Sequence, residues 1–391
     1  MKGVELSVGF IPLVDAAPLI VAQEMGFAAQ EGLALNLLRA SSWSSLRDLL
    51  VFGRVDAAHM LSPVPVASTL GLGGAGTTLS AISVLSVNGT VIGVNRALSD
   101  RMYAAGHGFG FDNARAAGNA LIAAARGPLR IGVPFPFSMH AELLYYWLSA
   151  LGLHAPQGID MRVVPPPLMA DALKAGDIDA FCVGEPWGSI AVEQGAGTLL
   201  MSGKSNWAFA PEKVLAVRND WANAEPALSA RLIRAVWHAG RWLADPANRV
   251  LTAELLARPE HLDLPAEIID RSISGAFTIS PVGEQRRVED FVTFHENAAN
   301  FPWRSQAQWI GYQMAARSGL DRVDAVARAA DVFRADIFRC ALADTGAMLP
   351  ETSSKIEGRI ESATLVTSKD GNQFMARDVF FDRLVFDPEA P

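Results

Sequence analysis

Apolar and polar residues follow two different periods along this chain, and the two periods alternate. Short apolar runs, typical of buried strands, cover Val4 to Phe10, Leu33 to Leu38 and Val55 to Met60. Helical patterns lie between them, at Asp15 to Gln30 and Ser42 to Phe52. Strands that alternate with helices favour a parallel sheet covered by helices. The first part of the chain is therefore predicted to form an α/β lobe.

The same unit occurs a second time. The stretch Gly53 to His59, Gly-Arg-Val-Asp-Ala-Ala-His, is matched by Gly176 to Cys182, Gly-Asp-Ile-Asp-Ala-Phe-Cys. An amphipathic segment precedes each glycine, a residue that readily takes the left-handed conformation at the end of a helix. Two related α/β lobes predict a cleft between them, bordered by strand ends and helix starts, where such folds usually bind ligands.

The pattern also predicts the domain boundaries. Asn88-Gly89 has the composition of a turn between the lobes, and the apolar run Lys213 to Arg218 is predicted to be the strand that returns to the first lobe. The stretch Arg96 to Phe111, rich in glycine and alanine, is predicted to be an exposed loop. We expect lobe one in residues 1–88, lobe two in 89–212, a helical continuation of lobe one in 213–344, and a surface tail of loops and short strands in 345–391.

Composition favours a compact protein that does not bind nucleic acid. The 391 residues are 50% hydrophobic and 19% charged, and the net charge is -8. Disordered chains lack such apolar content, and nucleic-acid surfaces are usually basic. An anionic ligand would need a local positive pocket. Cys182 and Cys340 are the only cysteines and lie too far apart in the sequence to suggest a disulfide framework or a thiolate zinc site.

The chain is expected to act in the cytoplasm. A strand pattern starts at Val4, directly after Met1-Lys2-Gly3, so no secretory leader is expected. The stretch between Asp56 and Arg96 has no Asp, Glu, Lys or Arg, but prolines and glycines interrupt it. We therefore predict a strand, a short helix, a glycine turn and a strand there, and no membrane span.

Three helix starts follow strand ends and are the candidate ligand site. They are Ser41 to Ser45, which contains Trp43, Pro136 to His140, and Gly184 to Trp187. Helix N-termini present unpaired N–H groups and a partial positive charge, so three of them around a cleft predict an anion site.

Each candidate side chain has a second interpretation that the pattern leaves open. Trp43 is either a core aromatic or a wall of the cleft, His140 and His59 are either structural or ligands, and Lys213 is either solvated or a ligand. Glu185 is interpreted as a carboxylate favoured by the helix dipole, without an acid–base role. Arg47, a turn beyond the helix start, is expected only to brace it.

Enzyme sites find little support in the sequence. Cys182 and His140 lack a third group that would orient them as nucleophile and base. No histidine pair has metal-ligand spacing, and the stretch Gly71 to Gly76 lacks the Gly-Lys-Ser/Thr ending of a phosphate loop. We expect no catalysis, no metal and no cofactor.

Five motifs in order carry a family resemblance. They are Gly9-Phe-Ile-Pro-Leu-Val-Asp-Ala-Ala-Pro-Leu, Ser42-Trp-Ser-Ser-Leu-Arg-Asp, Asp56-Ala-Ala-His-Met-Leu, Phe181-Cys-Val-Gly-Glu-Pro-Trp and Ala210-Pro-Glu-Lys-Val-Leu. With them the chain resembles the NrtA and CmpA family of nitrate and bicarbonate binding proteins of ABC transporters. Within that family it is most similar to the NasS-like cytoplasmic nitrate/nitrite sensors.

The resemblance implies a type II periplasmic-binding-protein fold with an anion held between two α/β lobes. The implied ligands are Trp43, His140, Gly184 and Lys213, and Thr90 stands where the transporters have a glutamine. The bicarbonate-binding relatives carry an acidic residue and a calcium ion at the lysine position, so a lysine there favours a bare monoanion. Nitrate accepts hydrogen bonds and donates none, which suits amides, an imidazole N–H and an ammonium.

The resemblance also implies a function. We expect a cytosolic nitrate or nitrite sensor whose partner is a NasT-like antiterminator with an ANTAR domain, released when the anion binds. The alternative is the substrate-binding component of an ABC transporter for nitrate, bicarbonate or a sulfonate. A pyrimidine-synthesis protein of the thiamine pathway shares the fold but relies on a cysteine-rich motif that this chain lacks.

Overall fold

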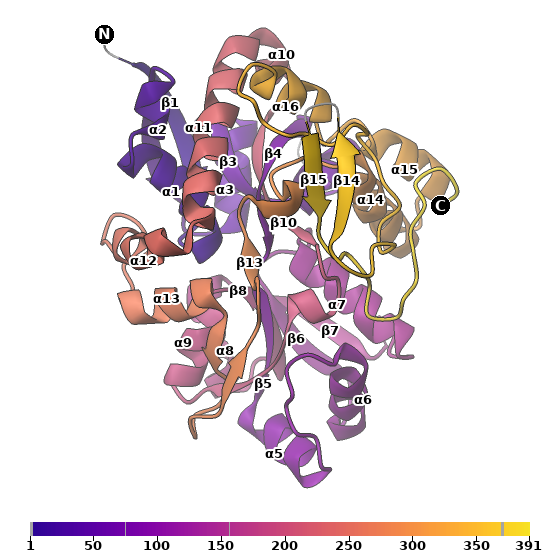
Figure 1. Ribbon diagram of the computed structural model, residues 1–391. Helices are drawn as coiled ribbons and strands as arrows, with labels where there is room; N and C mark the ends of the chain where they lie inside the picture. Colours follow the sequence, from indigo (N-terminus) through magenta and orange to yellow (C-terminus); the bar gives the residue numbers. More distant parts are fainter. Residues whose placement is uncertain (1–2, 75, 156, 369–370) are drawn as a thin grey trace.

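Two α/β lobes make up the computed structural model, which describes residues 3–74, 76–155, 157–368 and 371–391 (Figure 1). Met1 and Lys2 lie outside the described residues. Each lobe contains its own sheet with helices packed against it, so the predicted two-lobe α/β class is confirmed. None of the described helices is both long and apolar enough to cross a membrane.

The first lobe contains a six-stranded sheet in the order β13-β4-β10-β3-β1-β2. Strand β1 pairs in parallel with β2 and β3, whereas β10 runs antiparallel to β3 and β4. The strands are β1 (Val4–Phe10), β2 (Leu33–Arg39), β3 (Ala57–Leu61), β4 (Leu79–Asn88), β10 (Pro211–Arg218) and β13 (Val292–Thr293). The predicted strands of this lobe are therefore confirmed to within a few residues at their ends.

Helices from both ends of the chain surround this sheet. The long helix α11 (Pro226–Ala244) lies beside α1 and α2, and its Leu232 shares a hydrophobic core with Leu215 of β10. The other helices of this part are α1 (Ala17–Glu24), α2 (Phe27–Gln30), α3 (Trp43–Val51), α4 (Pro63–Thr69), α10 (Asn219–Ala224), α12 (Arg249–Leu256), α13 (Ala266–Ser274), α14 (Arg304–Ser318), α15 (Arg322–Ala329) and α16 (Ala335–Leu342).

The second lobe contains a five-stranded sheet in the order β7-β6-β8-β5-β9. Strand β6 pairs in parallel with β7 and β8, and β5 runs antiparallel to β8 and β9. The elements are β5 (Thr90–Asn95), α5 (Arg96–Ala104), α6 (Ala114–Ala124), β6 (Leu129–Val133), α7 (Met139–Ala150), β7 (Ile159–Val163), α8 (Met169–Ala175), β8 (Ala180–Gly184), α9 (Trp187–Glu193) and β9 (Gly197–Ser202).

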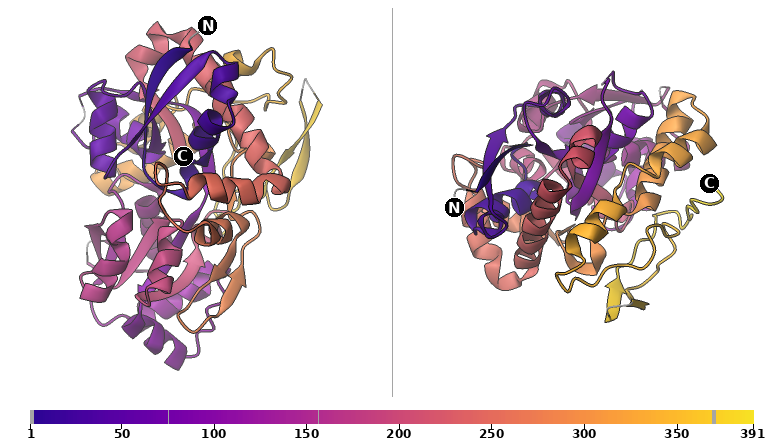
Figure 2. Two further views of the ribbon diagram at one scale, coloured as in Figure 1. Left: turned by 90° about the vertical axis from the view of Figure 1, so that its left-hand side faces the viewer. Right: turned by 90° about the horizontal axis from the view of Figure 1, so that it is seen from above.

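The chain passes between the lobes at several places. Gly89 alone separates β4 from β5, and residues 203–210 lead from β9 back to β10. A hairpin of β11 (Ala276–Thr278) and β12 (Gln285–Arg287) then lies against the second lobe, where Leu199 N donates to Ile279 O at 2.7 Å. The C-terminal segment, with the hairpin β14 (Thr364–Ser368) and β15 (Gly371–Met375), runs along one side of the molecule (Figure 2).

The sequence repeat produces the same local structure in both lobes. Gly53 and Gly176 both take positive φ, 66° and 72°, at the end of a helix. The aspartate of each repeat then accepts a backbone N–H from a strand that precedes it in its lobe, β1 in the first and β6 in the second, Ser7 N to Asp56 at 2.8 Å and Arg130 N to Asp179 at 3.1 Å. Each donor and acceptor lie 49 residues apart, so the predicted repeat is confirmed.

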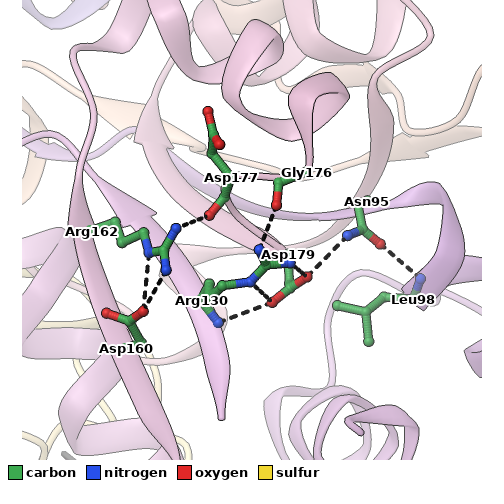
Figure 3. Close-up of polar contacts among 8 residues, drawn as sticks. All are labelled: Asn95, Leu98, Arg130, Asp160, Arg162, Gly176, Asp177 and Asp179. Atoms are coloured by element: carbon green, nitrogen blue, oxygen red, sulfur yellow. Dashed lines mark hydrogen bonds and ion pairs between the residues drawn. The ribbon is translucent and has the colours of Figure 1, made fainter. Parts of the chain in front are cut away.

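We expect the two repeat aspartates to contribute unequally to stability. Asp179 also accepts from the Arg130 guanidinium, Nε at 2.8 Å and Nη2 at 2.6 Å (Figure 3). Replacing either aspartate by alanine leaves a backbone N–H without its acceptor, which costs about 1–3 kcal/mol, and Asp179→Ala should lower the urea midpoint more than Asp56→Ala. Asp160→Ala, which breaks the exposed contact to Arg162, is the control and should change little. Equal midpoints for all three variants would contradict this.

Two local predictions were wrong. Residues 96–104 form helix α5 instead of an exposed loop, because the Asn95 side chain caps it by accepting from Leu98 N at 2.9 Å. The helix predicted from Asp15 to Gln30 is divided at Gly26, whose φ of 76° ends one helix before the next begins. Pro186 precedes helix α9 as its N-cap, after a cis peptide bond.

Candidate functional site

The four residues implied as ligands lie on four elements that meet between the lobes. Trp43 begins α3 and Lys213 lies on β10, both in the first lobe, while His140 is in the first turn of α7 and Gly184 ends β8 in the second. Each of the three side chains is at most 2% exposed. The lobes touch next to them, where Val14 N donates to Glu185 O at 3.0 Å.

Two of the three predicted helix starts are capped as expected. Ser42 accepts from Ser45 N at 3.2 Å at the start of α3, and Ser138 accepts from Ala141 N at 3.1 Å at the start of α7. The third, α9, has seven residues, and its N-cap Pro186 has no side-chain cap hydrogen bond. The Glu185 carboxylate accepts from Ser189 N at 3.2 Å.

Lys213 is a buried and paired ammonium. Its side chain has no exposed area, and Nζ lies 2.7 Å from Asp15 Oδ2 and 2.9 Å from Glu212 Oε1. Nζ also lies 5.5 Å from the centroid of the Trp43 ring, within the range of a cation–π contact. Burial opposes the charge, but the two carboxylates outweigh it and raise the pKa of Lys213. The interpretation of Lys213 as a solvated side chain is therefore wrong.

Both candidate histidines belong to this cluster. His59 on β3 places Nε2 2.9 Å from Asp15 Oδ1, and its ring centroid lies 5.6 Å from that of Trp43. His140 places Nδ1 3.2 Å from Glu212 Oε1. Burial lowers the pKa of His59, and burial together with the Lys213 charge lowers the pKa of His140 well below its usual value. Both rings are therefore neutral near neutral pH.

The two carboxylates differ in their ionisation. Burial would raise the pKa of Asp15, but Lys213 and His59 outweigh it and hold the pKa below its usual range, so Asp15 is charged. Burial raises the pKa of Glu212 to about 7, because the Lys213 charge compensates the loss of water only in part. Glu212 therefore changes its protonation state near neutral pH.

Three buried nitrogen atoms at the site have neither a hydrogen-bond nor an ion-pair partner within the described part of the chain. They are Trp43 Nε1, which can only donate, His140 Nε2 and His59 Nδ1. Gly184 borders the second of them, since a Cβ built on it would lie 3.9 Å from His140 Nε2 and 3.5 Å from Asp15 Oδ2. A glycine at this position thus leaves room beside the imidazole that a larger residue would fill.

The remaining predicted residues lie at the margin of the cluster. The backbone of Thr90 pairs with that of Gly184, and its side chain contacts Cys182. Its Oγ1 also lies close to Gly203, where a Cβ built on the glycine would clash with it. Arg47 donates to Asp48 at 2.7 Å and to the carbonyl of Gly73, away from the buried cluster. The structure therefore brings Trp43, His140, Gly184 and Lys213 together, with Thr90 beside them.

Asp15 and Glu212 were missed in the sequence analysis, although a signal for each was present. Asp15 is the only charged residue between Leu6 and Gln23, within a run that is otherwise apolar. Glu212 precedes Lys213 at the start of an apolar strand. A charged residue in a segment that must be buried needs a partner, and opposite charges in two such segments indicate a pair.

Comparison with known proteins gives a consistent picture. The model of the NMT1-like family matches residues 2–257. The "Nitrate/nitrite binding protein NrtA" of Synechocystis is 30% identical over 399 residues, which are 98% of this chain and 82% of that protein. The "Nitrate import ATP-binding protein NrtC" of Synechocystis is 35% identical over 321 residues, 81% of this chain but 46% of that protein. The chain thus spans about half the length of this latter relative.

The crystal structure of the periplasmic nitrate-binding protein NrtA from Synechocystis PCC 6803 resembles the chain over its whole length. It covers 100% of this chain and 97% of its own, with a TM-score of 0.84 and 29% identity. The predicted periplasmic-binding-protein fold of two α/β lobes is confirmed by this likeness.

Proposed function

Because the chain belongs to the NMT1-like family, which it shares with substrate-binding proteins of the NrtA type, we propose that it binds nitrate or nitrite between its lobes. The observation that supports this most is that two of the buried nitrogen atoms without partners, Trp43 Nε1 and His140 Nε2, lie in the same cluster as the Lys213 ammonium. A small planar anion offers acceptors to all three. We expect binding without catalysis.

Calorimetric titration tests this proposal. Nitrate or nitrite should give saturable heat with one site per chain, and treatment of the protein with EDTA should not change it, because no cofactor is expected. Bicarbonate and an alkanesulfonate are the comparison ligands. A bicarbonate site is expected to have a different balance of charges from a nitrate site, and an alkanesulfonate is larger than nitrate. Saturable binding of bicarbonate or the sulfonate without binding of nitrate or nitrite would contradict the proposal.

The finer proposal is a cytosolic sensor. The NasS-like resemblance supports a partner of the ANTAR-domain antiterminator class, which the protein holds without ligand and releases when the anion draws the lobes together. Such coupling requires the anion to favour one arrangement of the lobes over the other. Capture of the antiterminator on immobilised protein should fall when nitrate is added, and equal recovery with and without nitrate would contradict the sensor role.

The second candidate is the substrate-binding component of an ABC transporter. The names of the relatives, a nitrate import ATP-binding protein and a nitrate/nitrite binding protein, favour it. Anion binding would be the same in both roles, so the partner distinguishes them. Association with a membrane permease that depends on nitrate, without capture of the antiterminator, would support transport.

A further inference from the structure

The cluster around Lys213 carries more negative charge than a site for a bare anion should. Asp15 and an ionised Glu212 face a single ammonium, which leaves one net negative charge in a region that is at most 3% exposed. A monoanion would double that charge in a place with little water to screen it. Such burial of unbalanced charge is strongly unfavourable.

The other groups that face Glu212 do not remove the excess of negative charge. His140 on α7 and Lys213 on β10 contact Glu212 directly, the Asp15 charge acts on it, and the Cys182 thiol on β8 lies within reach of the Glu212 charge. His59 on β3 contacts Asp15. Both histidines are neutral, and burial raises the pKa of the thiol, so it stays protonated. Glu212 and His140 are therefore the groups that can take up a proton.

The short distance between His140 Nδ1 and Glu212 Oε1, 3.2 Å, leads to the same conclusion. Beside an ionised Glu212, the proton of a neutral imidazole is favoured on Nδ1, the ring nitrogen that lies next to the negative charge. The other nitrogen, Nε2, then offers a lone pair, which repels an anion. One further proton changes Nε2 from an acceptor into a donor. If the proton sits on Glu212, the negative charge that favoured the ring proton on Nδ1 is gone and the ring can carry its N–H on Nε2, and if it sits on the ring, both nitrogens carry an N–H.

We propose that nitrate enters this site together with one proton, which the Glu212–His140 pair takes up from solvent. The inference rests on the proposed function, because it concerns the same anion. Only an O–H or N–H bond forms within the pair, and the buffer supplies the proton. Glu212 is then a positioning residue, which makes His140 Nε2 a donor without touching the anion itself.

The sign of the pH dependence follows from linkage. Bound nitrate favours the pair with two protons, so the pKa of the pair is higher in the complex than in the free protein. Affinity is full below the pKa of the free pair and falls as the pH rises above it. Because burial raises the pKa of Glu212 to about 7, the decline should begin near neutral pH, at up to about tenfold per pH unit.

Calorimetry with nitrate tests this in two ways. Wild-type protein titrated at about pH 8 in two buffers of different ionisation enthalpy should show uptake of close to one proton per nitrate bound. This measurement needs no variant. The affinity of Glu212→Gln, whose amide is uncharged at every pH, should be nearly flat with pH and exceed that of wild type under alkaline conditions.

A matched control is available in the C-terminal segment. Glu357 is also a buried carboxylate paired with a lysine, Lys355, and burial raises its pKa. Glu357→Gln should keep the pH slope of wild type. Saturable nitrate binding without proton uptake and with no pH slope would overturn the inference alone. Absence of nitrate binding in wild type and Glu212→Gln at every pH would overturn the proposed function, and this inference with it.

Discussion

Lys213→Met is expected to abolish nitrate binding. Methionine keeps much of the side-chain volume but removes the ammonium, which is the one positive charge in contact with the buried cluster of Asp15, Glu212 and the two histidines in the described chain. Removing one charged partner from a buried ionic contact costs about 2–5 kcal/mol of binding, a loss of about 30-fold to several thousand-fold in affinity. Calorimetry with nitrate measures it.

The same variant should also unfold more easily, which has to be separated from the loss of binding. Without Lys213, Asp15 is a buried carboxylate with only a neutral histidine beside it, and such a change costs about 3–5 kcal/mol. Adding Asp15→Asn removes the unpaired charge and should recover most of the stability without recovering nitrate binding. Lys174→Met, at an exposed lysine of α8, is the control for both measurements.

Wild-type affinity in Lys213→Met would contradict the assignment of this lysine to the anion. Recovery of binding in the double variant would do so as well, because it would show that the ammonium serves only to neutralise Asp15.

Trp43→Ala is expected to have the second large effect. The indole is 2% exposed and packs against His59 and the Lys213 ammonium, so its removal leaves a cavity that costs about 3–5 kcal/mol of stability. Nitrate binding should be lost with the wall of the site. Thermal unfolding and calorimetry on the same sample measure the two effects.

Trp43→Phe separates packing from hydrogen bonding. Phenylalanine keeps an aromatic ring but has no N–H, and Trp43 Nε1 has no partner in the described chain, so the substitution removes no internal hydrogen bond. A hydrogen bond to a charged group contributes about 1.5–3 kcal/mol, so affinity for nitrate should fall about tenfold or more.

Trp207 supplies the matched control. It is fully buried, its Nε1 also lacks a partner among the described residues, and it packs against Trp309 and Phe380, whereas the ring at the Lys213 ammonium is that of Trp43. Trp207→Phe should leave nitrate affinity unchanged. An equal loss of affinity in both variants would mean that the indole N–H of Trp43 does not donate to the anion.

Local patterns were sufficient to predict the framework of this protein. The apolar runs, the glycines that end helices and the serines that begin them act over a few residues, so they are readable in the sequence without the fold. The repeat at Gly53 and Gly176 shows how far this extends, because the same short motif places an aspartate against a strand 49 residues before it in both copies. The error at residues 96–104 is also local, since the Asn95 cap was overlooked.

The chemistry of the site depends on distance in space and could not be read from the sequence. Asp15, His140 and Lys213 belong to a short turn, a helix and a strand that are far apart along the chain and meet only where the two lobes touch. Sequence patterns indicated which residues are buried, but the protonation state of a buried ionisable group depends on the groups that surround it in space. The lysine predicted to hold an anion alone is in fact paired with two carboxylates, and Glu212 titrates near neutral pH for the same reason. Short-range patterns thus account for the two lobes, and contacts between residues remote in sequence account for the charge balance where they meet.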